Sequence, residues 1–419
     1  MKEIRGGVCA PEGFRAGGIH CGIKASAAKR DLGMIVSEGP CTAAALFTTN
    51  RVQAASVILS REYLAGGDVR AVIANSGNAN ACTGPEGLMA ARRMTELAAG
   101  VLDLRPEQVA VASTGVIGVP LPMGAVEGGM SALAASLERS EAGHGAALEA
   151  IMTTDTRKKE GALEIELEGR SLRIGAMVKG SGMIHPNMAT MLCFITTDAA
   201  IERPLLDRAL RRAVGRSFNR LTVDGDTSTN DMVLVLANGM AAAPKITAGG
   251  PDYEIFAAAL ESLCVKLARE MARDGEGATR LITVQVKGAA SEQDAAALAR
   301  SVTGSSLVKA ACFGADANWG RVLCALGYAG VPFDPAAVSV RFSAPGATPG
   351  VASGAVLVCE RGGPVVFDEQ EARRILSGEE IVISIDLQMP GAKSGAGEAL
   401  AWGCDLSYDY VRINGDYRS

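Results

Sequence analysis

The segment that decides the architecture reads KGSGMIHPNMATMLCFITTD and spans residues 179–198. Its first half is irregular, because Gly180-Ser181-Gly182 and Pro186-Asn187 are turn-forming residues. Its second half is apolar, and the run Leu192–Thr197 predicts a strand. Thr190 stands where the two halves meet. The sequence therefore predicts a loop that leads into a strand, with a hydroxyl side chain at the junction.

Strand-like and helix-like runs alternate irregularly on both sides of this segment. The predicted strands are Ala71–Ala74, Leu163–Leu167, Leu172–Val178, Leu192–Thr197, Met232–Ala237, Leu281–Val286, Glu380–Leu387 and Tyr408–Ile413. The predicted helices are Pro85–Ala99, Val126–Arg139, Arg203–Val214, Tyr253–Arg273, Glu292–Ser301 and Asp368–Leu376. This mixture predicts an α+β fold with mixed α/β sheets. No Gly-x-Gly-x-x-Gly motif follows a strand, so a dinucleotide-binding domain has little support.

The composition limits the classes of partner. A chain of 419 residues with 48% hydrophobic residues can bury a sizeable core, in about two to three domains or one large one. Its net charge of −5 argues against a general nucleic-acid binder. No apolar run reaches the roughly 18 residues that span a bilayer, and the N-terminus does not resemble a signal peptide. We expect a cytoplasmic protein with neither nucleic acid nor membrane as a partner.

The usual catalytic and metal-binding residues are sparse. Ten single cysteines and three histidines form no C-x-x-C pair, so we expect no metal site and no disulfide framework. His185 is a candidate base, but a histidine before proline more often serves a turn. Asp224, Asp226 and Asp231 do not fit the calcium-loop spacing, and we expect them to cap turns. A basic stretch that we expect to be a solvated helix face contains Arg208, Arg211, Arg212, Arg216 and Arg220.

The junction threonine offers another route to catalysis. If the peptide bond before Thr190 were cut, this residue would carry a hydroxyl nucleophile and a free α-amine, whose reference pKa is roughly 7.7 to 8. Such an amine is a built-in general base, so an acyl-transfer enzyme can dispense with histidine. The residues alone leave open a purely structural role for this threonine.

The segment 179–198, with Ala189-Thr190-Met191-Leu192 at its centre, closely resembles the signature of the bifunctional ornithine acetyltransferase and glutamate N-acetyltransferase family of arginine biosynthesis. The resemblance covers nearly the whole chain through an ordered series of motifs: Gly13–Gly18, Asn75–Gly84, Ser113–Gly118, Thr153–Thr156, Ser217–Arg220, Val223–Asp231, Arg273–Thr279, Asp316–Arg321 and Tyr408–Asn414. It implies a fold shared with self-processing aminopeptidases, a cytoplasmic α2β2 heterotetramer and no cofactor, with acetyl-CoA as an acetyl donor in some members.

The resemblance also implies roles for individual residues. The chain is expected to cut itself between Ala189 and Thr190, which gives an α chain of residues 1–189 and a β chain of residues 190–419 with Thr190 as the nucleophile. The family's oxyanion hole falls on Thr114 and Gly115, and its substrate contacts fall on one of Thr153 and Thr154 and on Lys179, Thr190, Glu276, Asn414 and Ser419. We expect Lys179 to suit a substrate carboxylate and Glu276 to suit the ornithine amine.

The implied reaction is a ping-pong transfer of acetyl from N2-acetylornithine to glutamate through acetyl-Thr190, which yields ornithine and N-acetylglutamate. The motifs do not separate this glutamate N-acetyltransferase from members that also use acetyl-CoA. Two alternatives stay open. A self-processing N-terminal-threonine amidohydrolase or aminopeptidase would pass the acyl group to water, and a non-catalytic amino-acid-binding protein would keep an uncut chain.

Overall fold

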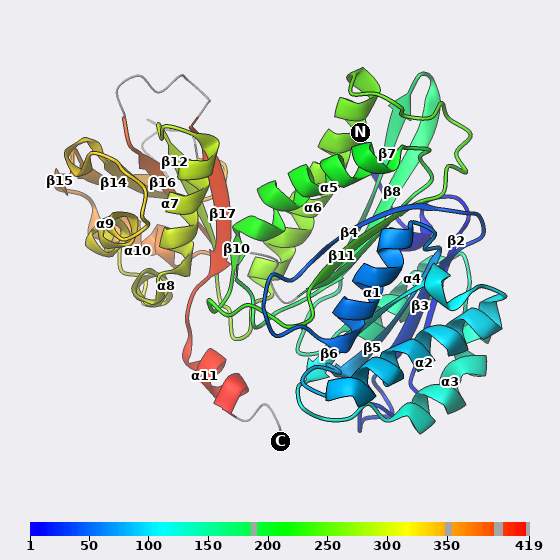
Figure 1. The fold of residues 1–419 in the computed structure, drawn as a ribbon. Helices are drawn as coiled ribbons and strands as arrows, with labels where there is room; N and C mark the ends of the chain where they lie inside the picture. Colours follow the sequence, from blue (N-terminus) through cyan, green and yellow to red (C-terminus); the bar gives the residue numbers. More distant parts are fainter. Residues whose placement is uncertain (186–190, 348–353, 389–396, 416–419) are drawn as a thin grey trace. The chain divides into compact units, whose positions relative to one another are not determined.

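The computed structural model describes residues 1–185, 191–347, 354–388 and 397–415. The chain divides into two compact units, each described here by itself. Unit 1 comprises Met1–Gly180, Asn187–Asn219 and Thr227–Leu267, and unit 2 comprises Ser181–Pro186, Arg220–Asp226 and Ala268–Ser419. The elements of both units are labelled in Figure 1.

Unit 1 contains two sheets in its described part. The six-stranded sheet has the order β1 (Lys2–Ile4), β7 (Lys159–Leu167), β8 (Arg170–Lys179), β9 (Leu192–Thr197), β11 (Met232–Ala237) and β4 (Thr42–Phe47). The four-stranded sheet has the order β2 (Phe14–Ile19), β3 (Leu32–Ser37), β5 (Ala71–Asn78) and β6 (Val109–Val116). The helices are α1 (Ala55–Gly66), α2 (Gly84–Leu102), α3 (Met123–Ala135), α4 (Glu141–Ile151), α5 (Arg203–Arg216) and most of α6 (Pro251–Arg273).

Alternating side chains of β3 show how unit 1 is layered. Ile35 belongs to a buried cluster that also contains Phe194 of β9 and Leu148 of α4, so this cluster joins the two sheets. Its neighbour Met34 belongs to a different buried cluster, which contains Met94 of α2 and residues of α1 and α3. Successive strand residues point to opposite faces, so the four-stranded sheet is covered on both sides.

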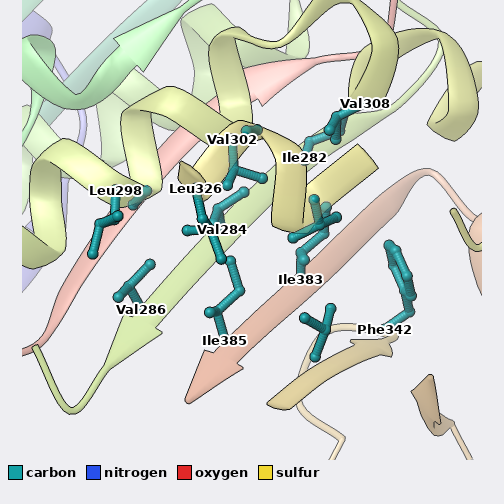
Figure 2. Close-up of a cluster of buried hydrophobic side chains, with 14 of the residues drawn as sticks. Ile282, Val284, Val286, Leu298, Val302, Val308, Leu326, Phe342, Ile383 and Ile385 are labelled. Atoms are coloured by element: carbon teal, nitrogen blue, oxygen red, sulfur yellow. The ribbon is translucent and has the colours of Figure 1, made fainter. Parts of the chain in front are cut away.

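Unit 2 is built on one sheet in its described part, with the order β10 (Leu221–Thr222), β17 (Ala399–Cys404), β12 (Leu281–Lys287), β16 (Glu380–Asp386), β13 (Ser339–Ser343), β14 (Ala355–Glu360) and β15 (Gly363–Pro364). Its helices are α7 (Glu292–Gly304), α8 (Ser306–Phe313), α9 (Trp319–Gly327), α10 (Glu369–Leu376) and α11 (Tyr408–Gly415). Figure 2 shows its core, in which Val284 of β12 and Ile383 of β16 face Val302 of α7.

The structure confirms the α+β fold and most of the predicted elements. The runs Leu192–Thr197 and Met232–Ala237 are β9 and β11 with identical bounds. The predicted strand Tyr408–Ile413 is wrong, because this run lies within helix α11. Its Tyr, Val and Ile residues favour a strand. Local interactions favour the helix: the Asp409 N–H donates to Ser407 Oγ (3.2 Å), and Arg412 pairs with Asp409 one helical turn away (3.1 Å).

Candidate active site

Thr114 and Gly115, the predicted oxyanion-hole residues, lie near the end of β6 beside its parallel neighbour β5. Gly115 pairs with Gly77, and the register is irregular at the next residue, Asn78. Gly115 has a φ of +136°, and a Cβ on it would lie 2.3 Å from the Gly77 carbonyl carbon and 2.5 Å from the Asn78 nitrogen. Only glycine fits such a contact between two backbones. The strand therefore presents its Gly115 peptide without a side chain.

Lys179 lies at the end of β8 and is only 3% exposed. Its Nζ donates a hydrogen bond to Thr114 Oγ1 at 3.3 Å. An ammonium group can only donate, so Thr114 Oγ1 must accept from it and the hydroxyl hydrogen is directed elsewhere. This contact makes the Thr114 hydroxyl a donor for another group, as an oxyanion hole requires.

Asp155, to which no sequence pattern assigned a role, forms an ion pair with Lys159 and lies near the charge of Lys179. Its Oδ1 accepts hydrogen bonds from Lys159 Nζ (2.8 Å) and from the Gly180 N–H (2.7 Å), and its Oδ2 accepts from the Thr153 N–H (3.0 Å). Burial alone would raise the pKa of Asp155, but the charges of Lys179 and Lys159 outweigh it and lower the pKa to about 2. The carboxylate thus joins the end of β8 to the segment after α4.

Thr153 and Thr154, the alternative substrate contacts, are both half-buried in this segment. Lys24 also reaches it, because its Nζ donates to the Met152 carbonyl at 2.7 Å. Burial lowers the pKa of Lys24 to about 8. The Lys24 stem also lies beside Gly77, where a Cβ would meet its Cγ at 3.0 Å. Neither a motif nor a periodic pattern marked Lys24 in the sequence.

In unit 2, Glu276 and Asn414 are brought together as neighbours. Asn414 Nδ2 of α11 donates to Glu276 Oε2 at 2.9 Å, although the two residues are far apart in the chain. Glu276 is 7% exposed, and its N–H donates to the Ser181 carbonyl at 2.8 Å. A Cβ on Gly182 would lie 2.2 Å from a Glu276 carboxylate oxygen, so the Gly-Ser-Gly loop runs against this side chain.

The residues after this loop are held by Asp224. Its carboxylate accepts hydrogen bonds from the Met183 N–H (2.5 Å) and the Ile184 N–H (2.9 Å). It also accepts from the Asp226 N–H at 3.2 Å, which confirms the prediction that Asp224 caps a turn. His185 Nδ1 lies 3.2 Å from Thr222 Oγ1, and burial lowers the pKa of His185. Ala189, Thr190 and Ser419 lie outside the described residues.

The basic stretch is a paired helix face over most of its length. On α5, Arg211 pairs with Asp207 at 2.7 Å, and Arg212 pairs with Glu254 and Glu261 of α6. Arg220 departs from the prediction of a solvated helix face. It lies beyond α5, is 8% exposed and donates to Glu292 at 2.5 Å.

Comparisons with known proteins agree with the resemblance. The model of the ArgJ family matches residues 15–419. The "Arginine biosynthesis bifunctional protein ArgJ" of Symbiobacterium thermophilum is 54% identical over all of both chains, and a relative of that name from Caldanaerobacter subterraneus is 48% identical, also over all of both chains. These matches confirm the prediction of an acyltransferase enzyme. The chain belongs to the ArgJ family, and its named relatives are bifunctional proteins of arginine biosynthesis.

Two solved structures are also similar to this chain. A chain of the ArgJ crystal structure from Bacillus halodurans is 44% identical, with a TM-score of 0.47, and the match covers 53% of this chain and 97% of that one. A chain of the Mycobacterium tuberculosis ornithine acetyltransferase complexed with ornithine is 40% identical, with a TM-score of 0.41, and the match covers 44% of this chain and 97% of that one. Within the described residues of the present chain, no helix is both long enough and apolar enough to cross a membrane.

Proposed function

We propose that this protein transfers an acetyl group from N2-acetylornithine to glutamate through an acetyl ester of Thr190. The observation that carries the proposal is the buried contact between Lys179 Nζ and Thr114 Oγ1 beside Gly115, in a chain of the ArgJ family. The contact leaves the Thr114 hydroxyl as a donor for another group, and we assign this hydroxyl and the Gly115 N–H as the two donors that a developing oxyanion needs.

The first step of this proposal is self-cleavage. The Thr190 hydroxyl attacks the Ala189 carbonyl, the peptide nitrogen leaves as the α-amine of Thr190, and water hydrolyses the resulting ester. The products are an α chain of residues 1–189 and a β chain of residues 190–419. The α-amine released in this step is the general base that the three histidines of the sequence do not provide.

Acetyl transfer then follows in two half-reactions. Thr190 attacks the acetyl carbonyl of N2-acetylornithine while its α-amine accepts the hydroxyl proton, and the oxyanion accepts hydrogen bonds from the Thr114 hydroxyl and the Gly115 N–H. The α-amine passes the proton to the departing ornithine nitrogen. The amine of glutamate next attacks the acetyl ester, which yields N-acetylglutamate and restores the Thr190 hydroxyl. No cofactor enters this cycle.

Two charged residues of the family motifs suit the two charged ends of an amino-acid substrate. We assign Lys179 to the substrate carboxylate and Glu276 to the ornithine side-chain amine, with Asn414 holding the Glu276 carboxylate. One of Thr153 and Thr154 and the Ser419 hydroxyl complete the proposed contacts. The second activity in the relatives' bifunctional name would use acetyl-CoA to acetylate the same Thr190. A cytoplasmic α2β2 assembly is part of the proposal.

The first test is the mass of the denatured protein. Wild type is expected to give two fragments that sum to the full chain plus one water, whereas Thr190→Ala gives one uncut chain. Thr196→Val is a matched control, because Thr196 is a buried threonine in β9 whose hydroxyl bonds the Val8 carbonyl, and this variant should be cut. An uncut wild-type chain would contradict the mechanism.

The second test separates transfer from hydrolysis. N2-acetylornithine alone should add the mass of one acetyl group to the β chain, and glutamate should remove it with formation of N-acetylglutamate. Loss of the acetyl group at the same rate with and without glutamate would instead favour the amidohydrolase. Supplying acetyl-CoA as the only donor then tests the second activity.

A further inference from the structure

Two adjacent residues before β11, Asn230 and Asp231, are almost fully buried, with exposures of 5% and 0%. Both lie in unit 1 and belong to the motif Val223–Asp231, in which the sequence predicted only turn caps for the acidic residues. Burial of a polar side chain costs free energy, which its hydrogen bonds offset. Their hydrogen bonds reach Met191, which follows the proposed nucleophile, and Ser113, which precedes the proposed oxyanion-hole residues.

Asp231 holds the residue that follows the proposed nucleophile. Its Oδ1 accepts a hydrogen bond from the Met191 N–H at 2.9 Å, and this nitrogen forms the peptide bond to Thr190. The Met191 carbonyl accepts from the Met232 N–H at 3.1 Å, at the start of the ladder that pairs Met232 with Leu192. Met191 is therefore fixed on both sides by Asp231 and its neighbour. Asp231 is fully buried, so this contact is made away from solvent, and the same burial raises the pKa of Asp231 well above its usual range.

Asn230 holds the strand that carries the proposed oxyanion hole. Its Nδ2 donates to the Ser113 carbonyl at 2.8 Å and to the Ala79 carbonyl at 2.7 Å. The Ser113 carbonyl belongs to the peptide that precedes Thr114 in β6. Asn230 Oδ1 accepts a hydrogen bond from Thr229 Oγ1 at 2.5 Å, so both the nitrogen and the oxygen of the Asn230 amide are hydrogen-bonded. The side chain consequently has one orientation in which all these bonds are made.

We propose that Asn230 and Asp231 are a positioning pair, which sets the residue bonded to the nucleophile against the backbone of Thr114 and Gly115. This inference rests on the proposed function of these residues. Because the two residues are adjacent in the chain, their hydrogen bonds hold β6 and Met191 at a nearly fixed separation. Acyl transfer depends on such placement, since a misplacement of about 1 Å can lower the rate about 100-fold. Neither residue touches the reacting atoms in this scheme.

The test compares Asp231→Ala with Asp198→Ala as a matched control. Asp198 is also a buried aspartate, one residue beyond the end of β9, and it accepts hydrogen bonds from the Glu12 N–H (3.0 Å) and the Arg173 N–H (2.7 Å). Activity is measured per processed chain, counted by the intact mass of the β chain. We expect Asp231→Ala to lower kcat about 10- to 100-fold with KM changed less than about threefold, and Asp198→Ala to retain kcat within about threefold.

Conservative replacement distinguishes positioning from general stability. Asp231→Asn keeps the Oδ1 acceptor for Met191 and should recover most of the lost kcat, whereas Asp231→Leu should not. Asn230→Ala should lower kcat in the same way through β6, and it carries the test if Asp231→Ala does not fold. Thermal unfolding is recorded for every variant. Equal losses of kcat in the Asp231→Ala and Asp198→Ala variants would overturn the positioning role.

The outcome for this pair can be separated from the outcome for the proposed function. If Thr190→Ala is inactive while Asp231→Ala and Asn230→Ala transfer acetyl at the wild-type kcat, the nucleophile stands and the positioning pair is wrong. If Thr190→Ala still transfers acetyl, the proposed function fails, and the positioning pair fails with it.

Discussion

At the scale of single residues, the position of Gly115 in the candidate site requires a glycine. Replacement by alanine would bring its Cβ to 2.3 Å from the backbone of Gly77, which can yield only if β5 and β6 separate locally. We expect Gly115→Ala to lower acetyl transfer about 100-fold or more, because it would move the peptide that is proposed to donate to the oxyanion. Single-turnover acetylation of the β chain, followed by mass, measures this.

Gly118→Ala is the control for backbone strain alone. Gly118 also has a positive φ, +79°, but a Cβ there would meet no atom within 4 Å. This variant should lose about 1 kcal/mol of unfolding free energy and little activity. Similar activity in the two variants would contradict an oxyanion role for the Gly115 peptide.

Asp155 is expected to make stability depend on acid. Its pKa is about 2 in the folded protein against an ordinary value of 3.8, so its contribution is complete at neutral pH and is lost as the pH falls from about 4 through 2. Asp155→Asn should lower the unfolding free energy by about 2 kcal/mol at pH 7, and the difference from wild type should shrink below pH 4. Urea unfolding at a series of pH values measures it.

The control for Asp155 is an exposed aspartate in an ion pair. Asp207 pairs with Arg211 on the surface of α5, and Asp207→Asn should change the unfolding free energy by less than about 1 kcal/mol. A difference between wild type and Asp155→Asn that does not change between pH 7 and pH 3 would contradict the role assigned to this carboxylate.

At the scale of elements, periodicity predicted those that are regular and largely buried. The runs of β9 and β11 are apolar throughout, and α6 repeats its apolar residues over a long stretch, so the sequence marks all three. Helix α11 was not predicted, because it depends on the Ser407 cap and on tertiary contacts such as the edge-on packing of Tyr408 against Phe313. The local pattern of residue types does not indicate such tertiary contacts.

The site was predictable to the extent that the family motifs mark it. They brought out Thr114, Gly115 and Lys179, which the structure brings together. Lys24 was missed because its contact with Met152 joins distant parts of the chain. Asn230 was missed for the same reason, since its amide reaches β6 and the end of β5. A hydrogen bond between distant segments has no fixed spacing in sequence.

Helix α11 supplies a prediction at its own scale. Asn414→Ala removes the donor to Glu276 and should raise KM for N2-acetylornithine about three- to tenfold with little change in kcat, because a carboxylate that is less firmly held binds the substrate amine less well. Arg412→Ala is the matched control, since Arg412 lies on the same helix in an exposed pair with Asp409. Steady-state kinetics compare them, and equal KM changes would contradict the role of Asn414.

At the scale of the whole molecule, the six-stranded sheet interleaves the two proposed chains. Strands β9 and β11, which follow the cleavage point, lie between β8 and β4, which precede it. The proposed self-cleavage would therefore leave the backbone hydrogen bonds on both sides of β9 and β11 intact. We expect the α and β chains to elute together in native size-exclusion chromatography, in the position of uncut Thr190→Ala, and to separate only in denaturant. Separate elution without denaturant would contradict this.

The pairing of β8 with β9, which places Lys179 opposite Leu192, affects how reversibly the protein unfolds. In the uncut chain a continuous backbone connects β8 to its antiparallel neighbour β9. Their pairing therefore closes a loop within one molecule, at modest entropic cost. After cleavage of this connection, the same pairing would require two separate chains to associate, and refolding would depend on their concentration. The proposed cleavage would thus make unfolding hard to reverse in dilute solution, and the working lifetime of the enzyme would then be set by its rate of unfolding.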